Sequence, residues 1–132
     1  MLKVHAKNLD KITILSLQGQ IVTGETEILR NAVQSLSQTN AVILDLARVS
    51  KIDAHGLGVM LELRERTHQN GVRFELMNVS KPVEIILEMT RLDSVFQITS
   101  RAEFLSAVSR VRRVSRLPRV RRRSLAALKS CA

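Results

Sequence analysis

Apolar and polar side chains follow two different repeats along this chain. Some segments have the repeat typical of strands, and others have the repeat typical of helices. Residues 2–6 alternate between apolar and polar side chains, and so do residues 12–17 apart from the apolar pair Ile14-Leu15, with the turn-like segment Asn-Leu-Asp-Lys at 8–11 between them. This pattern predicts a β-hairpin. Residues 41–46 are apolar apart from Asp45, which is typical of a central strand covered on both faces.

The segment between the hairpin and this central strand is predicted to be helical. We expect Gly19 to end the hairpin and Thr23 or Gly24 to open a helix. Glu25 and Glu27 would fall in the first turn, where the positive end of the helix dipole favours acidic side chains.

A second helix is expected to run from Asp53 as the N-cap to Gly71 just past its end. Residues 72–77 then form the next strand. Ser80 begins a third helix with Pro82 in its first turn, a position that suits proline.

The last elements are predicted to be a short strand over residues 95–98 and a helix that opens at Ser100 and carries Phe104, Leu105 and Val108. The order ββαβαβαβα predicts an α/β fold: a mixed, mostly parallel β-sheet with flanking helices.

Charge separates the chain into two parts. The 132 residues carry a formal net charge of +9, yet residues 1–108 contain 12 basic and 12 acidic residues. Residues 109–132 contain nine basic residues and no acidic one. We therefore expect one domain over 1–108 and a basic, Arg-rich extension over 109–132, disordered or partly helical. Such a tail could bind nucleic acid or an anionic membrane, although its composition favours a disordered extension with no binding role.

The sequence favours a cytoplasmic location and gives no sign of an enzyme or a membrane protein. No stretch approaches the ~20 apolar residues of a membrane span, and no secretory signal is present. The single cysteine, Cys131, favours a reducing compartment. We expect no enzyme, cofactor or metal, because the sequence offers no nucleophile–base pair, metal-ligand set or phosphate-binding loop. His55 and His68 would lie roughly 20 Å apart on one helix.

The junction Ile-Asp-Ala-His-Gly-Leu-Gly at residues 52–58 is the main candidate site. It lies where a predicted strand ends and a helix begins, and free N–H groups at a helix N-terminus suit an anion. The residues alone favour an ordinary strand-to-helix turn over a binding site, with Asp53 as the cap and Gly56 and Gly58 allowing close packing of helix and strand. Arg48 and Lys51 flank the junction and could meet an acidic partner.

Three blocks of sequence, in order, resemble the STAS family of sulfate-transporter and anti-sigma-factor-antagonist domains. The block Leu-Gln-Gly-Gln-Ile at 17–21 resembles the family's second-strand ending. Residues 42–46 with 52–57 resemble its central strand and phosphoacceptor loop, and residues 80–96 resemble its Ser-x-Pro-Val…Val-Phe ending. The resemblance implies the STAS-type fold over residues 1 to about 108 and a non-enzymatic binding function.

The resemblance also implies a partner and a switch. Stand-alone members bind an anti-sigma factor, usually a Ser/Thr kinase of the GHKL type, and so free a sigma factor for RNA polymerase. Phosphorylation of a loop Ser or Thr releases them, and a phosphatase restores them. Here Ala54 and His55 replace both hydroxyl residues, and Val22 replaces a usual Asp. The phosphoacceptor-equivalent position is therefore His55.

By analogy with the family, the partner-binding surface is a turn and the following loop with its helix start. Its residues are Gly19, Gln20, Ile21, Val22, Thr23, Asp53, Ala54, His55, Gly56, Leu57, Gly58 and Leu61. Our hypothesis is an anti-sigma factor antagonist that escapes phosphorylation at the usual loop. The alternative is a STAS subunit of a lipid-type ABC transport complex that contacts its ATPase. Nothing in the sequence indicates an oligomeric state.

Overall fold

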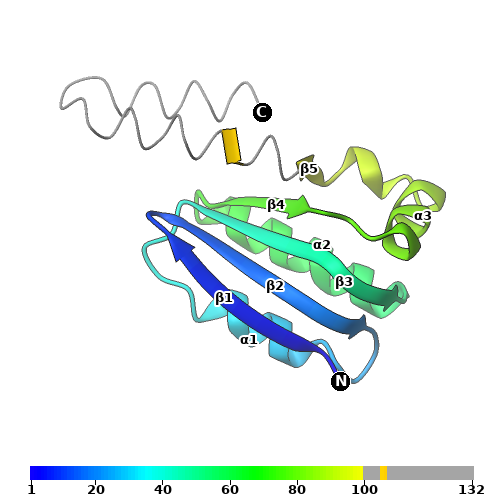
Figure 1. Cartoon of the computed structure of the whole chain (residues 1–132). Helices are drawn as coiled ribbons and strands as arrows, with labels where there is room; N and C mark the ends of the chain where they lie inside the picture. The colour runs from blue at the N-terminus through cyan, green and yellow to red at the C-terminus, as the bar shows by residue number, and fades with distance from the viewer. Residues whose placement is uncertain (100–104, 107–132) are drawn as a thin grey trace. The chain divides into compact units, whose positions relative to one another are not determined.

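The computed structural model describes residues 1–99 and 105–106. The chain divides into two units, Met1–Ile98 and Thr99–Ala132, and the first contains the sheet and its helices. The elements are β1 (Lys3–Leu9), β2 (Ile12–Ile21), α1 (Glu27–Gln34), β3 (Ala41–Ile52), α2 (Ala54–Gln69), β4 (Arg73–Met77), α3 (Lys81–Met89), the 3-10 helix η1 (Leu92–Ser94) and β5 (Gln97–Thr99) (Figure 1).

The five strands form one sheet in the order β1-β2-β3-β4-β5. Strands β1 and β2 pair antiparallel, whereas β2–β3 and β3–β4 pair parallel. This confirms the predicted mixed, mostly parallel sheet and the predicted element order as far as β5. Of the predicted last helix, Leu105 and Ser106 are helical, and its other residues lie outside the described part of the chain, as does the basic tail.

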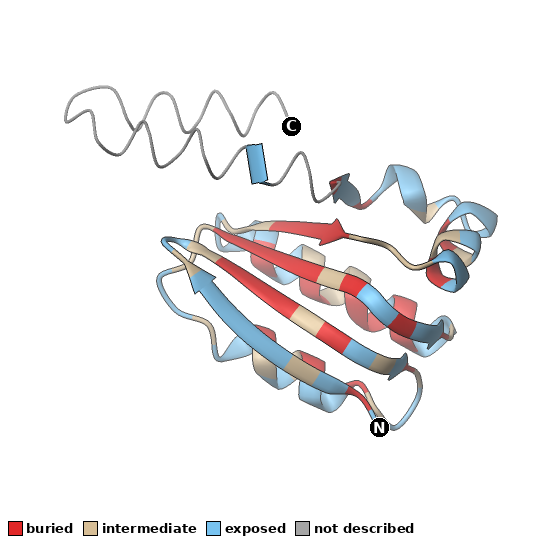
Figure 2. Cartoon of the chain, in the orientation of Figure 1, coloured by how far each residue is buried: buried red, intermediate tan, exposed pale blue. Residues whose placement is uncertain are grey.

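Helices α1 and α2 lie against one face of the sheet (Figure 1). The core between them is aliphatic: Leu15 and Leu44 from the strands pack with Leu29 of α1 and Leu63 of α2, all fully buried. Figure 2 shows the buried positions along β2, β3 and β4, while β1 is mostly exposed. Burial of this apolar surface is the main force that holds the helices on the sheet.

Strands β2 and β3 are longer than their apolar patterns predict. The antiparallel pairing of the hairpin ends at Gln18, directly before Gly19 as predicted, but β2 itself continues to Ile21 as a partner of β3. The polar residues Gln18 and Gln20 pair with Arg48 and Lys51 of β3, with two register shifts along the pair. Hydrogen bonds between the strands extend both of them here, and a pattern in one segment cannot reveal them.

Helix α1 begins later than predicted. Thr26 precedes its first residue, Glu27, so the prediction that Glu25 lies in the first turn is wrong. The backbone N–H of Glu25 instead donates to the carbonyl of Val22 (2.9 Å) in a turn. The carboxylate of Glu25 accepts from the backbone N–H of Leu2 (3.4 Å).

The later helix boundaries agree better with the prediction. Asp53 is the N-cap of α2, and Gly71 follows its end with φ +72°. Ser80 precedes α3 as predicted, but its hydroxyl donates to the carbonyl of Val49 (2.6 Å) instead of capping the helix. The strand predicted at 95–98 begins only at Gln97, because Val95 closes the turn of η1.

Candidate functional site

The candidate site lies where β2 and β3 end and α2 begins. Because these strands are parallel neighbours, their carboxyl ends meet at one edge of the sheet, with Ile21 opposite Ile52. The backbone N–H of Asp53 donates to the carbonyl of Ile21 (3.3 Å). The two segments predicted to form the partner-binding surface, 19–23 and 53–61, are therefore adjacent in the fold.

The carboxylate of Asp53 joins these two segments. One oxygen accepts from the backbone N–H of Gly56 (2.8 Å) and caps α2. The other accepts from both the backbone N–H (3.0 Å) and the hydroxyl (3.1 Å) of Thr23. The N–H donors of Thr23 and Gly56 hold the pKa of the Asp53 carboxyl below its usual range.

Gly56 and Gly58 have different roles, although the sequence analysis expected both to allow close packing. A Cβ atom on Gly56 would lie 2.0 Å from the carbonyl oxygen of Ile21, so only glycine fits there. A Cβ atom on Gly58 would meet nothing within 4 Å. The packing role predicted for Gly58 is therefore wrong. Gly58 instead leaves the helix backbone at this position exposed to solvent, with no side chain over it.

His55 is exposed on the first turn of α2. Its Nε2 atom lies 3.2 Å from the hydroxyl oxygen of Thr26, the residue that precedes α1. Thr26 is only 2% exposed, so the imidazole reaches a nearly buried hydroxyl and connects the starts of both helices. Residues 53–58 contain no hydroxyl side chain of their own. No local sequence pattern predicts the contact of Thr26 with His55, because the two residues are 29 positions apart in the chain.

An ion pair fixes the two helices behind the loop. The guanidinium of Arg30 in α1 donates two hydrogen bonds to the carboxylate of Glu62 in α2, at 2.9 and 3.1 Å, and also pairs with Glu27. Arg30 holds the pKa of Glu62 below its usual range, and both acids hold the pKa of Arg30 above its usual range.

The predicted surface divides by exposure. Five of its residues are exposed: Gln20, Thr23, Ala54, His55 and Gly58. Four are half-buried: Gly19, Val22, Asp53 and Leu61. Three are buried: Ile21, Gly56 and Leu57. The three buried residues pack inside the fold behind the loop, so a partner could not contact their side chains.

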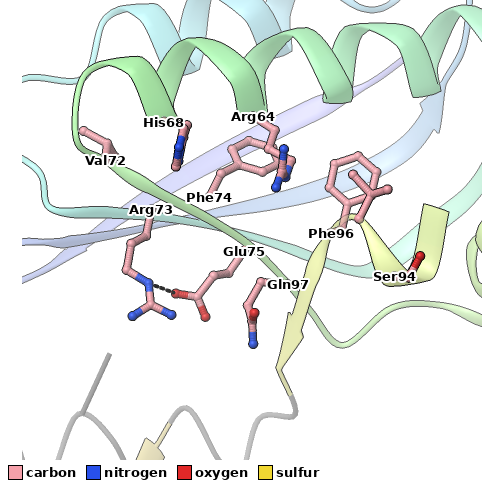
Figure 3. Close-up of a pocket in the computed structure, with 10 residues that line it drawn as sticks. Arg64, His68, Val72, Arg73, Phe74, Glu75, Ser94, Phe96 and Gln97 are labelled. Carbon is pink, nitrogen blue, oxygen red and sulfur yellow. Dashed lines mark ion pairs between the residues drawn. The ribbon is translucent and has the colours of Figure 1, made fainter. Parts of the chain in front are cut away.

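A cavity of about 210 Å³ lies elsewhere, between the second half of α2, β4 and the η1–β5 segment (Figure 3). Arg64 and His68 of α2 line one side. The rings of Phe74 and Phe96 lie beside them, with their centroids 6.2 Å apart. It contains none of the predicted site residues.

No group of three or more His, Cys, Asp or Glu side chains in residues 1–99 and 105–106 could hold a metal ion. None of the helices described is long and apolar enough to cross a membrane.

The five-stranded mixed sheet with its flanking helices defines a small α/β domain. The family model of the STAS domain matches residues 3–104, and the chain therefore belongs to the STAS family. This confirms the family resemblance on which the sequence analysis relied.

Three solved structures illustrate the similarity. An anti-sigma factor antagonist from Mycobacterium paratuberculosis is 19% identical with a TM-score of 0.71, covering 83% of this chain and 95% of its own. The anti-sigma factor antagonist SpoIIAA in its unphosphorylated form is 18% identical with a TM-score of 0.65, covering 81% and 96%. A sulfate transporter family protein from Wolinella succinogenes is 20% identical with a TM-score of 0.66, covering 76% and 87%. At these identities the structures show a shared fold.

Proposed function

We propose that this protein is an anti-sigma factor antagonist whose binding is not switched by phosphorylation of the β3–α2 loop. Its partner would be an anti-sigma factor of the GHKL Ser/Thr kinase type. The partner would contact the exposed residues Gln20, Thr23, Ala54, His55 and Gly58, with Leu61 at the margin. Membership of the STAS family and the anti-sigma factor antagonists among the similar structures support this class of partner.

The observation that carries the proposal is His55. A Ser/Thr kinase transfers phosphate to the oxygen of a side-chain hydroxyl, and residues 53–58 have no hydroxyl. Two hydroxyls that contact the loop already form hydrogen bonds: that of Thr23 bonds Asp53, and that of Thr26 is nearly buried against His55. The loop would therefore keep one charge state and one shape whether or not the kinase is active.

The surface around His55 suits close contact with another protein. Ala54 and Gly58 are exposed on the start of α2 and have almost no side chain, so a partner can approach the helix backbone. The hydrogen bonds of Asp53 and the Arg30–Glu62 pair hold this region in place before binding. A preformed surface loses little conformational entropy on association, which favours affinity.

The test compares the wild-type chain with His55→Ser and with His68→Ser as a matched control. His68 is an exposed histidine near the other end of α2, so this control adds a hydroxyl away from the loop. Each bait is used to capture partners, and the captured kinase is then supplied with labelled ATP. We expect all three baits to capture the same GHKL protein and only His55→Ser to become labelled.

Label on wild-type His55 would contradict the proposal, as would the absence of any GHKL protein from all three baits. A phosphatase partner is expected only for the phosphorylated His55→Ser form. Capture of an ATPase and a permease instead would support the alternative, a STAS subunit of a transport complex.

A further inference from the structure

One end of the sheet face opposite α1 and α2 carries three basic side chains. On β1, Lys3 lies between Leu2, which is buried, and Val4, which packs against the core. Side chains alternate across a strand, so Lys3 points to the face opposite α1 and α2. Arg48 and Lys51 of β3 precede the core residues Val49 and Ile52 and point to that same face.

The register of the strands brings these cations together. Lys3 and Arg48 both pair with Gln18, one from each side, and Lys51 pairs with Gln20. We call these five exposed residues the basic sheet face: Lys3, Gln18, Gln20, Arg48 and Lys51. Figure 2 shows that exposed positions occur among buried and half-buried ones at the start of β1 and at the ends of β2 and β3.

The three cations of the basic sheet face are not neutralised within the described part of the chain. None of them forms an ion pair there, whereas Arg30 and Arg73 both pair with glutamates. The nearest acid on the same sheet face along β3 is Asp45, whose carboxylate accepts from the backbone N–H of Ala47 (3.1 Å) and the side chain of Asn78 (3.4 Å).

The spacing suits an acidic protein surface. Adjacent strands lie about 4.8 Å apart, so the backbones of Lys3 and Arg48 are roughly 10 Å apart across β2. Arg48 and Lys51 are separated by a similar distance along β3. Carboxylates two turns apart on a helix, about 10 Å, match this spacing.

We propose that the basic sheet face binds an acidic surface of the same protein partner that docks at the β3–α2 loop. This inference rests on the proposed function, and it extends the interface from the loop onto the sheet. Gln20 connects the two regions, because it belongs to the exposed loop residues and also to the basic sheet face.

A protein fits this face better than nucleic acid or a membrane does. Only three cations are present, which gives weak electrostatic binding to a polyanion at physiological salt. The amides of Gln18 and Gln20 lie between them and can both donate and accept hydrogen bonds, as a folded protein surface requires. Complementary charges at the edge of an interface mainly raise the association rate and the specificity.

The test uses the full chain and the purified anti-sigma factor from the capture experiment. The patch variant combines Lys3→Gln, Arg48→Gln and Lys51→Gln. The charge-matched control combines Lys11→Gln, Arg64→Gln and Arg91→Gln, which lie outside this sheet face. A separate loop variant, Gly58→Arg, tests the docking site itself. Kd and association rate are measured at 50 and 200 mM salt.

We expect the patch variant to bind about tenfold more weakly than wild type, mostly through a slower association rate and with a reduced salt dependence. We expect the control to change Kd by less than about twofold. Equal affinities of the patch variant and the control, together with weak binding by Gly58→Arg, would overturn this inference and leave the proposed function intact.

If neither the patch nor the loop variant weakens binding, the proposed function fails, and a second measurement decides the inference. Backbone amide NMR of the full chain is recorded with a synthetic peptide of eight glutamates. Saturable shifts concentrated at the basic sheet face would support an acidic protein partner. Absence of shifts there would overturn it, as would tighter patch-dependent binding of a 20-base-pair DNA or of phosphatidylserine vesicles.

Discussion

Adding one methyl group at Gly56 and one at Gly58 should have opposite effects on stability. The two glycines are two residues apart in the first turns of α2. A Cβ atom on Gly56 would lie 2.0 Å from the Ile21 carbonyl oxygen and 3.0 Å from a methyl carbon of the Ile21 side chain. A Cβ atom on Gly58 would meet open space.

The size of the effect follows from that contact. Cβ atoms almost never approach other heavy atoms closer than 3.0 Å, so Gly56→Ala must move the start of α2 by about 1 Å. Overpacking a tight site costs about 1–3 kcal/mol and sometimes more. Because the obstacle is a backbone carbonyl that also accepts from the Asp53 N–H, no side chain can rotate away. We expect Gly56→Ala to cost about 3 kcal/mol, a Tm lower by roughly 15 °C.

Gly58→Ala is the matched control. Alanine is favoured over glycine in a helix interior by about 0.5–1 kcal/mol, which corresponds to a Tm higher by about 4 °C. Thermal unfolding followed by circular dichroism at 222 nm measures both variants, and urea unfolding gives the free energies. Equal stability of the two variants, or a Gly56→Ala protein as stable as wild type, would refute the close approach of α2 to β2.

Three further predictions concern the support of the loop and the core. Since hydrogen bonds lower the pKa of Asp53 in the folded state, its carboxylate stabilises the fold above the unfolded pKa of about 3.9. That stabilisation is lost as pH falls through the folded pKa. Asp53→Ala should therefore lower Tm by about 5 °C at pH 7, and by less with each step below pH 4 in a pH series of thermal melts. A double-mutant cycle of Arg30→Ala and Glu62→Ala should show a favourable coupling free energy for folding, and this energy should become smaller between 0.1 and 1 M NaCl. Additive effects of the two substitutions on stability at low salt would contradict the ion pair. Leu63→Ala, at a fully buried position, should cost about 2–5 kcal/mol in urea unfolding, clearly more than Leu61→Ala at a half-buried one.

Local sequence patterns determined much of the fold. Alternating residues marked the hairpin, the apolar run marked the start of β3, and Asp53 and Gly71 marked the ends of α2. These signals are readable because caps and side-chain periodicity depend on a few neighbouring residues. The family resemblance added the location of the loop around His55, which spacing alone could not separate from an ordinary turn.

Only the tertiary structure decided how distant segments meet. The polar ends of β2 and β3 form strands because each pairs with the other. Their own sequence patterns do not predict a strand there. Asp53 with Thr23, His55 with Thr26, and Arg30 with Glu62 are contacts between residues about 30 apart. The position of Ile21 decides that only glycine fits at residue 56, whereas residue 58 has space for a larger side chain. Lys3 and Arg48 come together solely through strand register, because register is a property of paired strands and not of one stretch of chain.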